Sequence, residues 1–114
     1  MEPHMDAILA NFEDMDWFDV RDGVRRKAFS GDGATIAMHE LLPGHEPRPH
    51  DHPYEQIVYV AEGEMDFHVG GKVHRLTKGG LLVIPPNVRH HGVVVGDRPA
   101  INIDIFTPRR AEYA

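Results

Sequence analysis

Turn-forming residues interrupt this sequence at intervals of about ten residues from Gly23 onward, and short β-prone runs lie between them. No segment after Gly23 has the apolar periodicity of a helix. The runs expected to form strands are 24–29, 34–41, 56–60, 65–69, 72–76, 81–84, 93–95 and 100–106. This rhythm predicts an all-β sandwich or barrel in which the last two runs form a hairpin.

Two local patterns refine the prediction. Apolar residues alternate with charged or polar ones over residues 64–69, which is typical of a half-buried strand. Gly70 and Gly71 follow at once, and glycine tolerates positive φ, so a tight turn is expected to lead into run 72–76.

The chain has 114 residues, which is the size of one domain, and its 41% hydrophobic content is enough for a buried core. It contains no cysteine, so disulfides, thiol nucleophiles and zinc ribbons are excluded. We expect an N-terminal arm over residues 1–22 and a β-barrel over residues 23–114. Residues 6–15 are expected to form either a short helix behind an Asp cap or an extended arm.

The charge and hydropathy of the chain limit the kinds of partner and location that are expected for it. Lys and Arg number 12 against 18 Asp and Glu, a net charge of -6, which disfavours nucleic acid. No apolar run reaches the roughly 18 residues of a membrane span. The acidic first residues are unlike a secretory signal, so a cytoplasmic location is expected.

Histidine is unusually frequent, with nine residues. In an extended chain, residues two apart point to the same side, so His50 and His52 can direct both imidazoles to one point. Gln56 has the same parity as this pair, and Glu55 has the opposite one.

A second histidine segment, residues 85–91, contains His90 and His91 next to another β-run. Two separate histidine segments that each adjoin a strand favour a metal site over isolated surface histidines. The remaining histidines that lack partners at ligand spacing are expected at the surface or around the site: His39, His45, His68 and His74.

The two histidine segments resemble the two sequence motifs of the cupin family. The first motif, G-x5-H-x-H-x3-E-x6-G, corresponds to Gly44, His50, His52, Gln56 and Gly63. The second, G-x5-P-x-G-x2-H-x3-N, corresponds to Gly79, Pro85, Asn87, His90 and Val94. Every spacing matches, but Gln56 replaces Glu, Asn87 replaces Gly and Val94 replaces Asn.

The resemblance spans residues 23–106 and implies an all-β cupin double-stranded β-helix, a jelly-roll barrel with a six-stranded core. It also implies a divalent ion, zinc, nickel, iron, manganese or copper, held by His50, His52, Gln56 and His90. The motif spacing favours His90 over His91. Neutral imidazoles and a neutral amide leave the charge of the ion uncompensated, so it would act as a strong Lewis acid toward oxygen ligands.

The last predicted strand places isoleucines on one face and Asn102, Asp104 and Phe106 on the other. If the isoleucines pack outward against a sheet or a subunit, Asp104 faces the cavity as an acid/base candidate. In the alternative arrangement the isoleucines fill the barrel and Asp104 lies in solvent.

The strings HDHPYEQ and DIFTPRRAEY resemble a cupin subgroup, the KdgF-type proteins, which linearise 4,5-unsaturated uronates to keto acids. By that resemblance Asp104 would transfer protons, Asn102 and Phe106 would line the pocket, and Arg110 would bind a carboxylate. The expected function is a metal-dependent isomerase or lyase acting on a small carboxylated sugar or keto acid. The alternatives are a metal-dependent dioxygenase and a non-catalytic module that binds a sugar or a metal. A homodimer is expected because a small barrel with an apolar arm has open edges to protect.

Overall fold

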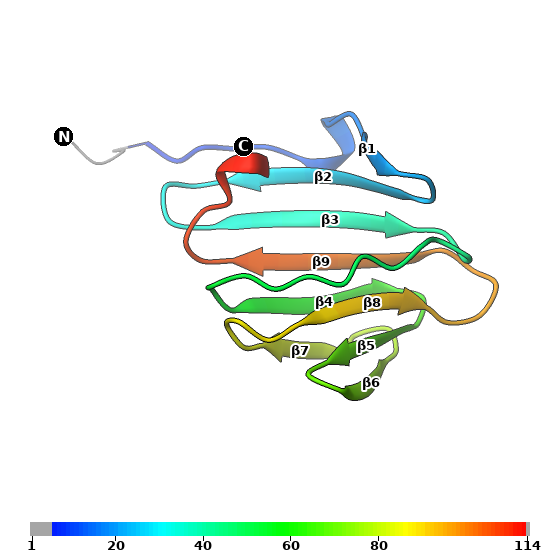
Figure 1. The fold of residues 1–114 in the computed structure, drawn as a ribbon. Helices are drawn as coiled ribbons and strands as arrows, with labels where there is room; N and C mark the ends of the chain where they lie inside the picture. The colour runs from blue at the N-terminus through cyan, green and yellow to red at the C-terminus, as the bar shows by residue number, and fades with distance from the viewer. Residues whose placement is uncertain (1–5, 114) are drawn as a thin grey trace.

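The computed structural model describes residues 6–113, which form two antiparallel β-sheets (Figure 1). One sheet has six strands in the order β1-β2-β3-β9-β4-β7, and the other has three in the order β6-β5-β8. The strands are β1 (Phe18–Arg21), β2 (Val24–Ser30), β3 (Thr35–Leu41), β4 (Gln56–Glu62), β5 (Met65–Val69), β6 (Lys72–Leu76), β7 (Leu81–Ile84), β8 (His90–Val94) and β9 (Ala100–Phe106).

The two sheets are held together by one apolar core. Val58, Val60 and Ile84 of the larger sheet are fully buried, and they belong to the same cluster as Met65 and Phe67 of the smaller sheet. Burial of such side chains contributes about 1.5–3 kcal/mol each, so this contact stabilises the face-to-face packing. The prediction of an all-β jelly-roll fold is confirmed.

Alternating patterns in the sequence correspond to alternating burial in the strands. In β5, Met65 and Phe67 are buried while Asp66 and His68 are partly exposed. Gly70 and Gly71 have φ of 56° and 85°, which suits the tight turn that joins β5 to β6. This hairpin is therefore as predicted.

The prediction of a final hairpin is wrong. β8 begins at His90 and pairs with β5 in the smaller sheet, whereas β9 pairs with β3 and β4 in the larger one. The chain crosses from one sheet to the other between these strands, as Figure 1 shows. The crossing matters for function because it brings residues from both sheets to the same interior.

The α-helix considered for residues 6–15 is not formed. A single 3-10 turn, η1 (Phe12–Asp14), lies within this segment, and Lys27 Nζ donates a 2.7 Å hydrogen bond to the Phe12 carbonyl. The arm ends in β1, which pairs with β2 through an irregular register. The domain boundary at residue 23 stays a prediction, and residues 1–5 and 114 lie outside the described residues.

The C-terminal segment after β9 returns to the larger sheet. A second 3-10 turn, η2 (Ala111–Tyr113), packs near β2, and the Arg110 backbone N–H donates a 2.9 Å hydrogen bond to Oγ1 of buried Thr35. This anchor fixes the position of Arg110 relative to the barrel. Within residues 6–113, no helix is long and apolar enough to cross a membrane.

Candidate metal centre and its cavity

Three imidazoles converge at one point, those of buried His52 and His90 and that of exposed His50. His50, His52 and His90 each offer a ring nitrogen, and these nitrogens all lie within 4.8 Å of one another. The backbones of His50 and His90 are joined by two reciprocal hydrogen bonds of 3.0 and 2.8 Å, which form an isolated bridge. The Asn87 N–H donates a 2.7 Å bond to the His52 carbonyl, so the second histidine segment is tied to both histidines of the first.

Backbone carbonyls determine which nitrogen of each ring carries the proton. The Nδ1 atom of His50 lies 2.7 Å from the Arg48 carbonyl. The corresponding distances are 2.8 Å from His52 Nδ1 to the Tyr54 carbonyl and 2.8 Å from His90 Nδ1 to the Val88 carbonyl. A carbonyl only accepts, so each Nδ1 donates and each Nε2 keeps its lone pair for a cation.

Gln56 completes the group from the first residue of β4, as its parity with His52 predicts. Its Nε2 donates a 2.8 Å hydrogen bond to Oδ1 of Asp104, so its Oε1 is directed at His52 Nε2, 3.1 Å away. Both of these facing atoms are acceptors when His52 donates through Nδ1. Two lone pairs that face each other at this distance fit a cation bound between them.

His90 gives a second indication that the residues fit a metal ion. Its Nε2 is buried and has no hydrogen-bond partner among the described residues, and the side chain is 3% exposed. An unpaired buried polar atom is costly unless something binds it. Burial and the neighbouring His50 and His52 lower the pKa of His90, which favours the neutral, ligating form.

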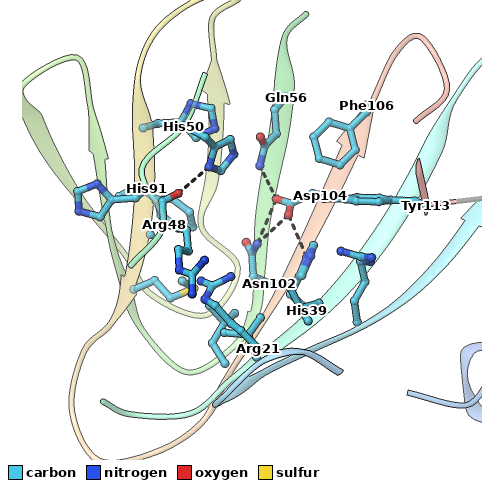
Figure 2. A pocket seen from close by; sticks show the side chains of 18 of the residues that line it. Arg21, His39, Arg48, His50, Gln56, His91, Asn102, Asp104, Phe106 and Tyr113 are labelled. Atoms are coloured by element: carbon cyan, nitrogen blue, oxygen red, sulfur yellow. Dashed lines mark hydrogen bonds and ion pairs between the residues drawn. The ribbon is translucent and has the colours of Figure 1, made fainter. Parts of the chain in front are cut away.

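Asp104 lies inside the cavity and not in solvent. It is 5% exposed, and its carboxylate accepts hydrogen bonds from Gln56 Nε2 and from Asn102 Nδ2 (Figure 2). His39 Nδ1 lies 3.1 Å from Asp104 Oδ2, an ion-pair distance, although the approach does not align as a hydrogen bond. Of the two orientations left open by the sequence, the inward one is correct.

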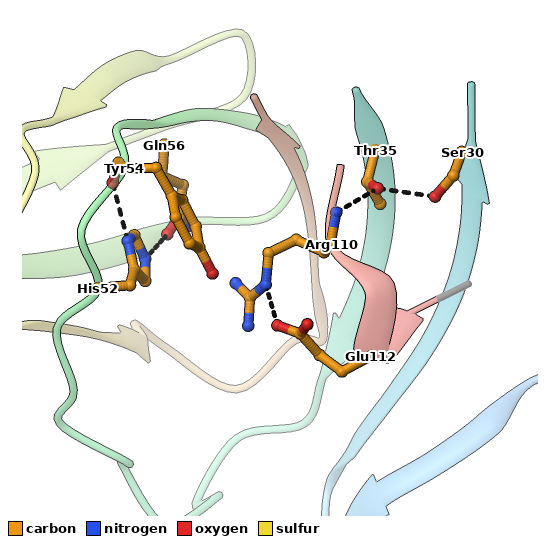
Figure 3. Close-up of polar contacts among 7 residues, drawn as sticks. All are labelled: Ser30, Thr35, His52, Tyr54, Gln56, Arg110 and Glu112. Atoms are coloured by element: carbon orange, nitrogen blue, oxygen red, sulfur yellow. Dashed lines mark hydrogen bonds and ion pairs between the residues drawn. The ribbon is translucent and has the colours of Figure 1, made fainter. Parts of the chain in front are cut away.

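Arg110 reaches the same cavity from the segment after β9. Its guanidinium lies 4.8 Å from the centre of the Phe106 ring and 5.1 Å from that of Tyr54. It also forms an ion pair with Glu112 (Figure 3). The guanidinium is therefore held among aromatic rings, where it can exchange its exposed partner Glu112 for a ligand carboxylate.

The other histidines occupy different positions. His91 points away from the three-imidazole group and stacks on His68, with ring centres 4.3 Å apart. His45 is buried, and its Nε2 accepts a 3.3 Å hydrogen bond from the Val94 N–H. His39, expected at the surface or around the site, is the second of these, because it contacts Asp104.

The cavity has a volume of about 150 Å³, below the usual range for drug-sized ligands, so it suits a small molecule. Its lining includes His50, His90, Gln56, Asp104 and Phe106. Sequence reasoning missed several further lining residues: Arg21, Arg26, His39, Arg48 and Tyr113. No spacing in the sequence links them, because they come from five different elements or loops.

The fold is a jelly-roll barrel, and imidazoles from two segments of the chain converge at its cavity. These two features define a class of proteins in which two β-sheets enclose a histidine-rich site that could hold a cation. Within that class, the chain belongs to the cupin family, because the Cupin domain family model matches residues 37–106. The relatives agree with this assignment.

The pectin degradation protein KdgF of Dickeya dadantii is 32% identical over 100 residues, which cover 85% of this chain and 89% of that protein. The structure of KdgF from Halomonas sp. superposes with a TM-score of 0.88 at 27% identity, covering 96% of this chain and all of that one. An RmlC-like cupin from Shewanella frigidimarina gives a TM-score of 0.86 at 27% identity, with 96% and 97% of the two chains covered.

A more distant relative has a different activity in its name. Acireductone dioxygenase of Bacillus pumilus is 30% identical over 78 residues, which is 64% of this chain but only 44% of that protein. The chain thus spans less than half of the dioxygenase.

Proposed function

We propose that the chain is a metal-dependent isomerase or lyase acting on a small carboxylated sugar or keto acid. The observation that carries the proposal is the contact of Gln56 with both His52 and Asp104, because it joins a cation site to a carboxylate in one cavity. His50, His52, Gln56 and His90 would be the metal ligands. When bound, a divalent ion supplies a Lewis acid that stabilises negative charge on a ligand oxygen.

Asp104 would move the protons. Its oxygens accept hydrogen bonds from two neutral amides, Gln56 and Asn102, which hold the carboxylate in place without neutralising it. His39 Nδ1 lies 3.1 Å from Asp104 Oδ2, at ion-pair distance. Phe106 and Asn102 line the cavity beside it, and Arg110 would bind the carboxylate of the substrate.

The likeness to a pectin degradation protein supports an unsaturated uronate as substrate. Linearisation of such a sugar is a redox-neutral isomerisation. The ring C–O bond breaks, the hydroxyl at carbon 1 loses its proton to give the aldehyde, and carbon 4 gains a proton as carbon 5 becomes a ketone. One group that takes up a proton and returns one is sufficient, which matches the single carboxylate of the cavity.

The acireductone dioxygenase relative supports a second candidate, oxygen-dependent chemistry with the same ligands. The four proposed ligands are all neutral, whereas anionic ligands are common where iron activates oxygen. This difference favours the isomerase. A module that binds a sugar or a metal without turnover is the third candidate, and it makes no use of Asp104.

The test is an assay of the metal-loaded protein with a 4,5-unsaturated galacturonate, following loss of the ultraviolet absorbance of the conjugated double bond. Asp104→Asn should lower turnover by about 100-fold or more while metal content stays normal. Asp66→Asn, which alters an exposed carboxylate on the smaller sheet, is the control. Comparable activity in Asp104→Asn would remove Asp104 from the mechanism, and metal-dependent oxygen uptake would favour the dioxygenase.

We also propose that the chain is a cytoplasmic homodimer joined through the outer face of the larger sheet. Cross-strand partners on this face are apolar: Ile57 pairs with both Val83 and Ile105, and Tyr59 pairs with Leu81 and Ile103. Leu81 is 69% exposed and Val83 54%. We favour a second copy of this chain as the partner on this face, because the patch is uncharged and two chains that each carry a net charge of -6 can approach each other there. A two-fold axis would bring the same patch of both copies into contact.

A further inference from the structure

The cavity has the opposite charge to the chain as a whole. Four arginines line it, Arg21, Arg26, Arg48 and Arg110, against the single carboxylate of Asp104. The whole chain carries a net charge of -6. A cleft lined by one sign of charge concentrates ions of the other sign, so the cavity attracts anions.

The four arginines form two groups on different sides of the cavity. Arg110 lies over the ring of Tyr113, as does Arg26 at 3.9 Å. Arg21 and Arg48 lie on the opposite side of the cavity from Phe106 and Tyr113, and Figure 2 shows their guanidinium groups directed toward each other. Both also line a neighbouring surface pocket.

Within the described part of the chain, no carboxylate neutralises Arg21 or Arg48 by a direct ion pair. Burial and the nearby Arg48 charge lower the pKa of Arg21, and the Glu46 carboxylate only partly opposes them. Two like charges held close together repel, and a bound anion relieves that repulsion.

Two hydrogen bonds hold the chain around these arginines close to His50. Arg21 Nε donates a 3.1 Å hydrogen bond to the Glu46 carbonyl, which holds β1 against the segment before His50. The Arg48 carbonyl accepts from His50 Nδ1 at 2.7 Å. The Arg48 side chain therefore leaves the chain beside a proposed ligand of the ion.

From these observations we infer that Arg21 and Arg48 form a second anion-binding subsite, so that the preferred ligand carries two anionic groups, one at Arg110 and one at this pair. The ligand class is then a small sugar acid with a carboxylate or phosphate at each end. This inference rests on the proposed function only in taking the same cavity as the substrate site, because a simple uronate carries one carboxylate and would occupy only the Arg110 side. Its test measures binding and does not depend on turnover.

The experiment compares D-gluconate with D-glucarate, two linear six-carbon sugar acids that carry one and two carboxylates. Calorimetric titration of the metal-loaded protein at low ionic strength should give an affinity for glucarate about tenfold higher than for gluconate. Arg48→Gln, which leaves every backbone contact in place, should remove this preference while changing gluconate affinity less than about twofold. Arg21→Gln should do the same, and Arg98→Gln in the exposed turn between β8 and β9 is the control.

Equal affinity for the two acids, or no binding of either, would overturn the subsite. The subsite would also be overturned if Arg48→Gln weakened the binding of both acids equally, or if Arg98→Gln removed the preference for glucarate. Failure of the proposed function looks different: a uronate would not be turned over although glucarate is still preferred. Turnover of a uronate without any glucarate preference would leave the proposed function in place and remove only the subsite.

Discussion

Gln56 donates a 2.8 Å hydrogen bond from Nε2 to Oδ1 of Asp104, so the orientation of an amide beside three imidazoles is determined by a buried carboxylate. This contact explains a departure from the cupin motif. Glutamate at position 56 would place a second acceptor against Asp104, whereas glutamine can donate to Asp104 and still present an oxygen to His52.

The first prediction concerns this pair. Gln56→Glu should retain metal and lower turnover by about 100-fold, because two adjacent carboxylates share a proton and Asp104 loses its donor. Adding Asp104→Asn to Gln56→Glu should relieve the contact between the two carboxylates and return thermal stability to the wild-type value, while metal stays bound and turnover is not restored. Metal analysis and activity measurements check both variants. Wild-type activity in Gln56→Glu would contradict the role given to the amide.

The second prediction concerns the metal ligands. His50→Ala and His90→Ala should each lose most of the bound divalent metal, as measured by elemental analysis of the purified protein, because each removes one of three converging nitrogens. The melting temperature of the wild-type protein should rise when metal is added after chelation, since an ion that binds only the folded state stabilises it. His74→Ala, an exposed residue of β6, is the control. Full occupancy in both ligand variants would place the metal elsewhere.

The third prediction concerns acid stability. Burial lowers the pKa of His45 below its ordinary value of 6.5, so the unfolded chain takes up a proton more readily than the folded one. The free energy of unfolding should therefore fall as the pH drops through the window between 6.5 and the lowered pKa. Denaturant titrations at several pH values measure this slope.

His45→Gln should have a shallower slope than wild type, because glutamine does not titrate in this range and can also accept from the Val94 N–H. Burial lowers the pKa of His90 as well, so part of the slope should remain. Identical slopes in the two proteins would show that His45 does not contribute.

The fourth prediction concerns assembly. Val83→Glu should convert a dimer to a monomer, because it places a charge in the apolar face of the larger sheet, where Val83 pairs with Ile57. Val73→Glu is a matched control, since Val73 of β6 is 55% exposed and Val83 is 54% exposed. Analytical ultracentrifugation gives the mass. A monomeric wild-type protein, or a dimer that survives Val83→Glu, would exclude this interface.

The strands and the central residues of the site follow from local patterns in the sequence. Alternating polarity locates β5 and β9, and the parity of His50, His52 and Gln56 places them on one side. The inward orientation of Asp104 needed the structure, because alternation alone does not tell which face of β9 is inside.

Relations between strands were harder to predict. Neighbouring strands in sequence usually pair, yet β8 and β9 belong to different sheets, and the polar start of β8 at His90 concealed its first residues. The contact between His39 and Asp104 was not predicted for the same reason. His39 lies opposite Asn102 across β3 and β9, and it reaches Asp104 diagonally, a contact that depends on register between strands far apart in the chain.

The three imidazole rings are oriented by hydrogen bonds to the backbone carbonyls of Arg48, Tyr54 and Val88, each two positions away from its histidine in the chain. Any amino acid supplies that oxygen, so the side chains of Arg48 and Val88 are not needed for these hydrogen bonds, whereas the Tyr54 ring also stacks on His52 with ring centres 4.3 Å apart. Substitution of Arg48 or Val88 would therefore change the surroundings of the proposed cation site and leave the backbone bond that orients each ring in place. The ligand preference of the proposed site and its affinity for a cation could then vary independently in this barrel.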